Sequence, residues 1–533
     1  MSFINESTAE QSVIQTLRSL GYEYVPSSEI ERPKTESILQ NRFRSALNRV
    51  NPHAYPDAIE EAICKFFAIS SSNIVEDNQK IHSFIADGMD VEYFKDGRSV
   101  GEHIMFIDYD NVADNDFLAT NQFTIIENGR NRRADIVVFI NGLPLAVIEL
   151  KNPVDENATL ENAYNQLQTY KDQVQSLFRC NEVLVISDGV NGRVGSLTAE
   201  MDRFMPWRTV DGKNLSPANQ LQLDVLVNGL FRKDFFLDFV RNFILFGVNR
   251  TQIEKKIAGY HQFHAVRKAV QSAVVASSIK GDRRAGVVWH TQGSGKSLSM
   301  VFFCRRIVQV QEMENPTLVI LTDRNDLDDQ LFETFASHVD FLRQTPIQVS
   351  DRSDLREKLK TSAGGVIFAT IQKFSESPEP LSARRNILVI ADETHRSQYD
   401  FIDGFARKVR DALPNASFIG FSGTPIEKND RNTPAIFGNY IDIYDIAQAV
   451  EDGATVPIYH ESRLAKFSIS EESLQDIDTE FEEITEDEEN NQKSKNKWSK
   501  LEVLVGEKNA LGSLLMISLI TIRKEAKPST KKR

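Results

Sequence analysis

The chain has 533 residues, of which 41% are hydrophobic and 26% charged, and it carries a formal net charge of −14 at pH 7. This composition is that of a soluble globular protein, and the length exceeds one hydrophobic core, so we expect two or three domains. The three cysteines, Cys64, Cys180 and Cys304, lie far apart in the sequence. They support neither a disulfide framework nor a cysteine zinc site, and they fit a reducing, cytoplasmic location.

Membrane attachment is not expected. The N-terminus lacks the basic flank and apolar centre of a signal peptide. The longest apolar run near the end, residues 511–522, is interrupted by polar residues and is too short to span a bilayer.

Most of the negative charge lies in one segment. Residues 471–489 contain eleven acids and no Lys or Arg, so the rest of the chain is close to neutral. Near-neutrality does not exclude DNA as a partner, because a protein that holds phosphates through backbone N–H groups and a few cations needs no basic surface overall.

In chain order, residues 1–210 are expected to form the first domain. Apolar residues at helical spacing predict a helix that starts near Thr8 and stops at Gly21. Helices and strands then alternate. Among them, RRADIVVFINGLPLAVIELKNP, residues 132–153, predicts two apolar strands around a turn.

Three charged residues interrupt these apolar strands. Asp135 opens the first strand, and Glu149 and Lys151 close the second. Glu149 and Lys151 are two residues apart, so their side chains share a face. A two-residue turn of Asn141 and Gly142 puts Asp135 on the opposite face, whereas a three-residue loop or an equivalent bulge pairs it with Glu149. A shared site therefore requires the longer loop or a bulge in place of the simple two-residue hairpin.

If Asp135 and Glu149 meet, they can hold one Mg²⁺ ion with Lys151 beside it. Such an ion can activate water and stabilise the charge on a scissile phosphate. The helix predicted over residues 161–174 carries Gln166 and Tyr170 one turn apart, where they could orient the lysine or contact DNA. The simpler alternative is that these charges only line the wet edge of a sheet.

After this domain, residues 211–220 predict a turn-rich linker, and residues 223–246 predict a pair of Phe-rich helices. We assign residues 211–255 to a helical connector packed between domains. From about Gly286 onward, short apolar strands alternate with helices, which predicts a doubly wound parallel sheet over residues 256–445.

HTQGSGKS, residues 290–297, follows a predicted strand and opens a predicted helix, as a phosphate-binding loop does. Its glycines let backbone N–H groups point at the phosphates, Lys296 reaches the outer phosphates, and Ser297 can hold Mg²⁺. The predicted nucleotide-binding residues of the loop are Thr291, Gly293, Ser294, Gly295, Lys296 and Ser297.

ILVIADETH, residues 387–395, supplies a second acidic element. Asp392 at the end of this strand can hold the Mg²⁺ through water, and Glu393 can polarise the water that attacks the terminal phosphate. An ordinary strand end would look similar, but the position after a phosphate loop favours the functional interpretation.

These motifs resemble the superfamily 2 helicases and translocases, which share an ATP-binding fold of the RecA-like type. YHQFHAVRKAV, the phosphate loop, LTDRNDLDDQ, ATIQKF, DETH and FSGTP occur in the family's order. The resemblance implies that Tyr260 and Gln262 read the adenine and that Thr370 and Gln372 lie near the DNA track. It also implies that the segment from Ser422 through Gly423 and Thr424 to Pro425 couples hydrolysis to DNA movement.

His261 and His264 are spaced as helical metal ligands can be. No third ligand accompanies them, so metal binding at this pair is not favoured.

The N-terminal domain resembles the Asp…Glu-x-Lys nucleases with a trailing Q-x-x-x-Y, and the resemblance implies a restriction-endonuclease-like domain with a mixed sheet. A nuclease of this kind followed by a superfamily 2 motor is similar to the restriction (R) subunits of type I restriction enzymes. The resemblance implies ATP-driven DNA translocation and Mg²⁺-dependent cleavage of double-stranded DNA, together with separate methylation and specificity subunits. Two alternatives stay open, a DNA repair helicase-nuclease and an inert fragment that only binds ATP or DNA.

Family R subunits are much longer than this chain. We assign residues 446–533 to an incomplete start of the second motor lobe, an acidic linker and an aberrant tail, and we expect a truncated or frameshifted product. ATP binding and the nuclease site would survive in such a product, whereas translocation would not, since an arginine of the second lobe normally completes the ATP site.

Overall fold

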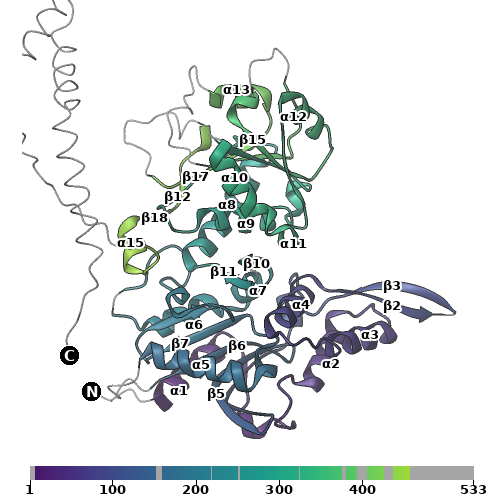
Figure 1. Ribbon diagram of the computed structural model, residues 1–533, viewed down its shortest axis with the longest axis vertical. Helices are drawn as coiled ribbons and strands as arrows, with labels where there is room; N and C mark the ends of the chain where they lie inside the picture. The colour runs from purple at the N-terminus through teal and green to yellow at the C-terminus, as the bar shows by residue number, and fades with distance from the viewer. Residues whose placement is uncertain are drawn as a thin grey trace, which may run out of the picture. The chain divides into compact units, whose positions relative to one another are not determined.

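The computed structural model describes residues 6–456 apart from short gaps at 96, 152–158, 218, 250–251, 323–324, 375–379, 393–404 and 425–435. The chain divides into two compact units, residues 1–456 and 457–533. The second unit lies outside the described residues, and so do Glu393 and Pro425 (Figure 1).

The N-terminal region begins with the predicted helix, and its end at Gly21 takes a positive φ of 88°. Three further helices and a separate two-stranded ribbon precede the main sheet. No helix in the described part of the chain combines the length and apolarity needed to cross a bilayer. The elements are α1 (Glu6–Ser19), α2 (Gln40–Val50), α3 (Pro56–Phe67), α4 (Ile74–Asp87), β2 (Met89–Lys95) and β3 (Arg98–Ile104).

The first large sheet has seven strands in the order β1-β4-β5-β6-β7-β8-β9. It is mixed, because β5 and β6 are antiparallel while β6 and β7 are parallel. The mixed sheet expected from the sequence is therefore confirmed. Its strands are β1 (Glu23–Tyr24), β4 (Phe117–Glu127), β5 (Arg130–Ile140), β6 (Leu143–Leu150), β7 (Val183–Ser187), β8 (Gly192–Gly195) and β9 (Met205–Pro206).

The hairpin between β5 and β6 closes with the two-residue turn, contrary to the longer loop considered above. Asn141 and Gly142 have φ of 51° and 79°, and Ile140 pairs with Leu143. The turn is favoured because Asn141 is fully buried, with its side chain donating to the Phe106 carbonyl at 2.9 Å.

A β-bulge two residues beyond the turn supplies the one-residue register shift that the turn does not. Phe139 pairs with Pro144, but Val138 pairs with Ala146, so Leu145 is the extra residue. Leu145 and Ala146 both join the hydrophobic cluster that contains Val138. The alternative of an equivalent bulge is thus the one that the chain adopts.

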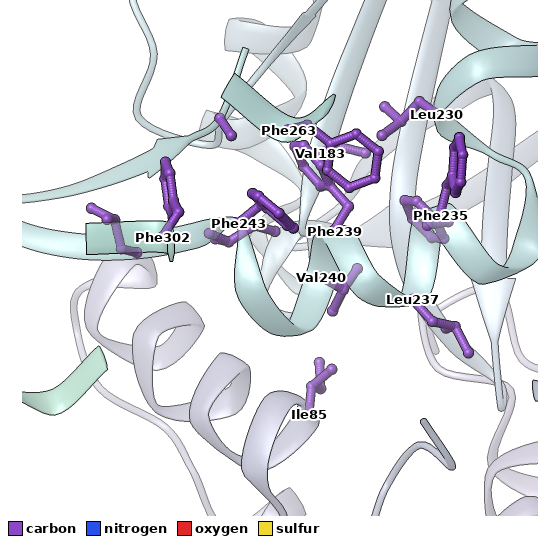
Figure 2. Close-up of a cluster of buried hydrophobic side chains, with 14 of the residues drawn as sticks. Ile85, Val183, Leu230, Phe235, Leu237, Phe239, Val240, Phe243, Phe263 and Phe302 are labelled. Atoms are coloured by element: carbon purple, nitrogen blue, oxygen red, sulfur yellow. The ribbon is translucent and has the colours of Figure 1, made fainter. Parts of the chain in front are cut away.

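The connector contains the two predicted helices, but its last part is a β-hairpin. Residues 244–249 and 252–257 form β10 and β11, where the sequence had suggested continued helix to residue 255. Figure 2 shows Phe235 and Phe239 of α7, and Phe243 just after its end, close to Phe263, with Phe302 near Phe243. The elements are α6 (Gln222–Leu230), α7 (Lys233–Asn242), β10 (Ile244–Asn249) and β11 (Gln252–Ile257).

The second large sheet is parallel in every described pairing, with the order β14-β15-β13-β16-β17-β12-β18. Its strands are β12 (Arg284–His290), β13 (Thr317–Thr322), β14 (Pro346–Gln348), β15 (Val366–Thr370), β16 (Ile387–Asp392), β17 (Ser417–Ser422) and β18 (Tyr440–Tyr444).

Helices cover both faces of this sheet. Val288 of β12 joins the apolar cluster shared with α8 and α9, whereas Val287 joins the cluster shared with α12 and α13. This alternation confirms the doubly wound α/β class. The helices are α8 (Tyr260–Ser277), α9 (Lys296–Ile307), α10 (Asn325–Ala336), α11 (Val339–Leu342), α12 (Arg352–Lys358), α13 (Phe405–Ala412) and α15 (Ile446–Glu451).

Candidate functional site

The bulge brings two carboxylates to the same face of the mixed sheet. Ile136 pairs with Ile148, so the register continued by one residue sets Asp135 opposite Glu149. Glu149 is fully buried, and Asp135 is 7% exposed. Asp135 Oδ2 accepts a 2.8 Å hydrogen bond from the backbone N–H of Leu150, which fixes its position next to the second strand.

Lys151 lies against this pair. Its backbone N–H donates to the Ser187 carbonyl at 2.9 Å, so the parallel pairing with β7 holds the main chain just beyond β6. Its Nζ donates to Glu149 Oε1 at 2.8 Å. Its side chain keeps 19% exposure, so the cation stands between the buried carboxylate and solvent.

Helix α5 (Leu160–Gln173) covers this face and carries the two predicted polar residues. Gln166 accepts from Lys151 Nζ through its amide oxygen and donates through its amide nitrogen to the Tyr170 hydroxyl. The Tyr170 hydroxyl donates to the Arg133 carbonyl at 2.9 Å. The structure therefore joins Gln166 and Tyr170 to the lysine in one hydrogen-bonded chain.

Burial, together with the nearby Asp135, raises the pKa of Glu149 to about 8, and Lys151 opposes this effect. No hydrogen-bond donor reaches the buried Glu149 Oε2. Two carboxylates that are close together and shielded from water favour the binding of a shared cation or proton.

The donor set suits Mg²⁺, which commonly binds through one or two carboxylates and keeps several waters. Among the described residues there is no cluster of three or more His, Cys, Asp and Glu side chains.

The predicted phosphate loop joins β12 to α9. Gly293 and Gly295 have φ of 82° and 81°, a left-handed conformation that suits glycine. The backbone N–H of Thr291 donates to the Tyr444 carbonyl at 2.9 Å, and Ser294 Oγ donates to the Thr291 carbonyl at 2.6 Å. A Cβ at Gly295 would lie 2.8 Å from Gln262 Nε2, so the loop leaves no room there for a side chain.

Lys296 and Ser297 begin α9 directly after this loop. An N-terminal turn presents unpaired N–H groups to a phosphate. The loop therefore has the shape that a nucleotide phosphate requires.

The two residues expected to read the adenine have different surroundings. Gln262 donates through Nε2 to the Gly295 carbonyl at 3.0 Å and accepts from the Gly259 N–H at 2.9 Å. Tyr260 donates to Asp452 Oδ2 at 2.6 Å and lines a cavity of about 330 Å³ beside the loop. Gln262 is thus tied to the loop, and Tyr260, although buried, forms part of the cavity wall.

His261 and His264 do not converge on one point. The His261 ring lies 4.0 Å from the Tyr444 ring in a stacked arrangement, and its Nε2 contacts the Ser294 carbonyl at 3.1 Å. The His264 ring packs on Trp207 with centroids 5.9 Å apart. Burial lowers the pKa of both histidines to about 3, so both are neutral.

The remaining motif residues lie along one edge of the parallel sheet. Asp392 pairs with Phe421, one residue before Ser422, and Ser422 pairs with Trp289 next to the phosphate loop. Since all described strands are parallel, their carboxyl ends share this edge.

Thr370 also lies at this edge, opposite Thr322, and Gln372 is exposed just beyond it. The hydroxyl of Ser422 donates to the Thr424 carbonyl at 2.9 Å, across Gly423. The described FSGTP residues therefore adjoin the phosphate loop.

Several site residues carried no signal in the sequence. Asp452 accepts hydrogen bonds from the hydroxyl groups of both Tyr260 and Tyr444, although it lies 192 residues after Tyr260 in the chain. Arg208 pairs with Asp452 Oδ1 at 2.8 Å and so links the N-terminal region to the same place. The Lys255 side chain is wholly buried, in a segment that the sequence had assigned to a helical connector.

Comparison with known proteins gives two family matches. Residues 3–203 match the model described as type I restriction enzyme R protein N terminus. Residues 261–494 match the model described as SWI2/SNF2 ATPase. The two matches follow one another in the order expected from the motifs.

Two relatives extend across both regions. The type I restriction enzyme HindI endonuclease subunit of Haemophilus influenzae is 45% identical over 487 residues, covering 86% of this chain and 46% of the relative. A Methanocaldococcus jannaschii protein, provisionally named as the MjaIXP endonuclease subunit of such an enzyme, is 35% identical over 540 residues, covering 94% of this chain and 50% of the relative. The chain therefore spans about half the length of the curated relatives it matches.

Among solved structures, the UvsW helicase from bacteriophage T4 matches with a TM-score of 0.29 and 18% identity, over 46% of this chain and 82% of that chain. This overlap is too weak to bear on the fold, which rests on the strands described above.

Proposed function

Because the chain belongs to the family of type I restriction enzyme R proteins, we propose that it is the restriction subunit of a type I restriction-modification system. In that role it cuts foreign double-stranded DNA in a reaction that depends on ATP and Mg²⁺. The observation that carries the proposal is the meeting of Asp135, Glu149 and Lys151 on one face of the mixed sheet.

At this site Asp135 and Glu149 would hold one Mg²⁺ through their carboxylate oxygens. When bound, the ion would supply an activated water and stabilise negative charge on the scissile phosphate. Lys151 provides a second positive charge on the solvent side of Glu149. Gln166 and Tyr170 keep the lysine in place through their hydrogen bonds.

The loop after β12 binds the phosphates of ATP. Lys296 would neutralise the outer phosphates, Ser297 and Asp392 would hold the accompanying Mg²⁺, and Glu393 would activate the attacking water. Tyr260 lines the cavity that receives the base. Gln262 holds the phosphate loop through its hydrogen bond to the Gly295 carbonyl. The loop residues assigned to the phosphates are Thr291, Gly293, Ser294, Gly295, Lys296 and Ser297.

The proposed partners are double-stranded DNA and the methylation and specificity subunits of a cytoplasmic complex. In this proposal residues 1–210 form the endonuclease domain, 211–255 the connector and 256–445 the first motor lobe. Translocation along DNA requires a second motor lobe, and we propose it only where such a lobe accompanies these residues.

Cleavage of plasmid DNA tests the nuclease assignment. The full chain, supplied with methylation and specificity subunits, ATP and Mg²⁺, should cut unmodified DNA. Asp135→Ala, Glu149→Ala and Lys151→Ala should each abolish cutting, because each removes a ligand or charge of the site, while binding of an ATP analogue stays at the wild-type level. Cutting that persists in all three variants would refute the assignment.

The same assay separates the alternatives. A repair helicase-nuclease would digest DNA from its ends without the added subunits, and an inert fragment would show no Mg²⁺-dependent nicking under any condition. Dependence of cutting on the specificity subunit supports a restriction role.

A further inference from the structure

The bulge at Leu145 is held from outside the hairpin. The Leu145 carbonyl accepts a 2.7 Å hydrogen bond from the Glu182 backbone N–H and a 3.4 Å hydrogen bond from Asn181 Nδ2. Both donors belong to the segment that leads into β7. Since the bulge sets the register that places Asp135 opposite Glu149, the position of this segment bears directly on the proposed metal site.

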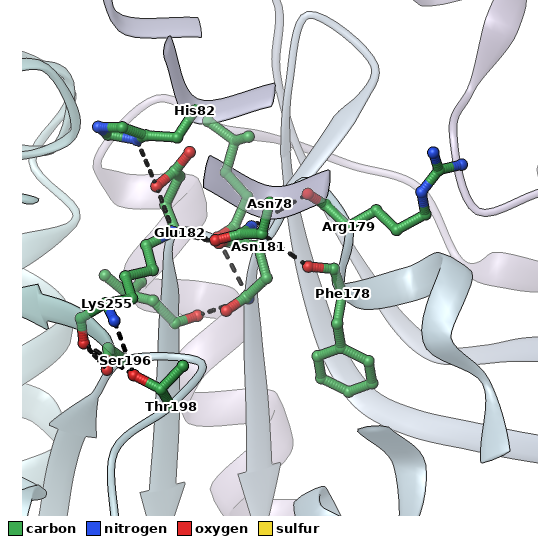
Figure 3. Close-up of polar contacts among 11 residues, drawn as sticks. Asn78, His82, Phe178, Arg179, Asn181, Glu182, Ser196, Thr198 and Lys255 are labelled. Carbon is green, nitrogen blue, oxygen red and sulfur yellow. Dashed lines mark hydrogen bonds and ion pairs between the residues drawn. The ribbon is translucent and has the colours of Figure 1, made fainter. Parts of the chain in front are cut away.

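A buried lysine contacts both residues of that segment, and Asn78 Nδ2 also donates to the Asn181 carbonyl at 2.9 Å. Lys255 Nζ donates to the Asn181 carbonyl at 2.6 Å and to Glu182 Oε2 at 2.7 Å, and it also reaches Asn78 Oδ1 at 3.0 Å (Figure 3). Its side chain and that of Glu182 are both 0% exposed. All three donor positions of the ammonium group are therefore used inside the protein.

Other contacts hold Lys255 and Glu182 in place. The Lys255 carbonyl accepts from Ser196 Oγ at 2.6 Å, and its N–H donates to Thr198 Oγ1 at 2.8 Å. Glu182 Oε2 lies 2.9 Å from Nδ1 of His82 on α4. The group is thus a fixed arrangement rather than a loose surface pair.

Lys255 also lies close in sequence to a residue that contacts the phosphate loop. It stands on β11, and the chain enters α8 at Tyr260. Gln262, seven residues after Lys255, donates to the Gly295 carbonyl of the phosphate loop. One short stretch of chain therefore touches both the bulge support and the phosphate loop.

A purely stabilising ion pair would be the simpler explanation. Buried ion pairs, however, add little net stability compared with apolar residues, because desolvation offsets their attraction. Here the hydrogen bonds of the lysine converge on the two residues that hold the bulge. That convergence favours a role for Lys255 in setting the geometry of the bulge.

We propose that Lys255 is a positioning residue for the Asp135–Glu149 site. It holds the Asn181–Glu182 segment, that segment holds the Leu145 bulge, and the bulge sets the carboxylate register. This inference rests on the proposed nuclease function for its activity readout, but the support of the bulge can be measured independently.

The test uses the full chain and its Lys255→Met variant. Met keeps the length of the side chain and removes the three donors. Peptides covering residues 143–150 should exchange amide hydrogens faster in the variant. The Mg²⁺ concentration for half-maximal DNA cleavage should rise about 10–100-fold, as expected when support of a metal ligand is lost. Affinity for an ATP analogue should not change.

Two further variants exclude a general loss of stability. Lys255→Met combined with Glu182→Gln removes both charges, so it should recover the thermal stability lost in the single variant. It should still need more Mg²⁺, because Met cannot donate to Asn181. Arg305→Met is the matched control, since Arg305 is a buried cation bonded to Asp87 of α4, and Asp87 keeps Arg343 at 2.8 Å. This control should leave the Mg²⁺ requirement unchanged.

The inference fails if the double variant has the wild-type Mg²⁺ requirement, or if Arg305→Met raises that requirement as much as Lys255→Met. A different outcome separates this inference from the proposed function. If Lys255→Met speeds exchange only in residues 143–150 but the wild-type chain never cuts DNA, the support of the bulge is upheld and the nuclease function is refuted.

Discussion

At the scale of single residues, Glu149 is the most informative side chain. It is buried beside another carboxylate, and its pKa is raised to about 8 by burial and by Asp135. An acid in such a place is either protonated or bound to a cation at neutral pH. The same carboxylate therefore costs stability when the site holds neither proton nor metal.

The pH dependence of stability follows from this shift. The folded chain keeps the Glu149 proton up to about pH 8, whereas the unfolded chain loses it near the ordinary glutamate pKa of 4.5. Folding takes up a proton between these values, so stability from this group falls as pH rises through that window. In a chelating buffer, Glu149→Gln should gain stability over wild type from pH 5 to pH 8, by at most about 1.4 kcal/mol per pH unit.

Urea unfolding at pH 5 and pH 8 measures this difference. The matched control is Glu161→Gln, because Glu161 is an exposed acid on α5. An equal effect of Glu149→Gln at both pH values would show that this carboxyl does not titrate in the window.

Tyr170 gives a second prediction at this scale. Its hydroxyl bonds both Gln166 and the Arg133 carbonyl, and so it fixes the partner of Lys151. Tyr170→Phe should lower the rate of DNA cleavage about tenfold by releasing Gln166. Tyr164→Phe, on the same helix, removes only a 3.5 Å contact to the Ala199 carbonyl and should cut at the wild-type rate. Equal rates for the two variants would contradict the orienting role.

At the scale of elements, the hairpin shows what sequence can and cannot predict. The strands, the charged residues and the two possible faces all follow from the alternation of apolar residues around Asn141 and Gly142. The bulge does not, because its stability comes from the Leu145 carbonyl bonded to residues 181 and 182. A long-range contact of this kind leaves no local pattern.

The tight turn itself can be tested. Gly142 has a positive φ, and a Cβ there would lie 2.7 Å from both the Leu39 carbonyl and the Phe43 N–H. Gly142→Ala should therefore lower the free energy of unfolding by about 2–4 kcal/mol, from backbone strain and overpacking together. Gly129, in the turn between β4 and β5, has a similar φ of 74° and nothing within 4 Å of its Cβ position.

Gly129→Ala is thus the control, because it introduces backbone strain without overpacking. Thermal unfolding should show a clearly larger loss for Gly142→Ala. The packing argument would be wrong if the two variants lost the same stability.

At the scale of the whole molecule, one of the hydrophobic core clusters extends across the connector from the mixed sheet to the parallel sheet. Phe243 contacts Phe263 of α8 at 4.7 Å and Phe302 of α9 at 5.6 Å between ring centroids. The same cluster includes Ile136 and Ile148 of the mixed sheet. The Phe-rich stretch predicted such packing, but its partners lie far along the chain and could not be named from sequence alone.

A shared core makes the stability of the two sheets interdependent. A nucleotide that binds the loop after β12 should stabilise the slowest-exchanging amides of β5 and β6 as well, by about 2.7 kcal/mol at a hundredfold excess over Kd. Hydrogen exchange with and without an ATP analogue measures this effect.

Lys296→Ala should abolish this protection of β5 and β6, because the analogue no longer binds. Phe263→Ala should preserve binding but confine the protection to the parallel sheet, since this substitution removes the ring that joins α7 to α8. Protection confined to the parallel sheet in the wild-type chain would mean that the two sheets unfold independently, and the nuclease site would then gain no stability from ATP.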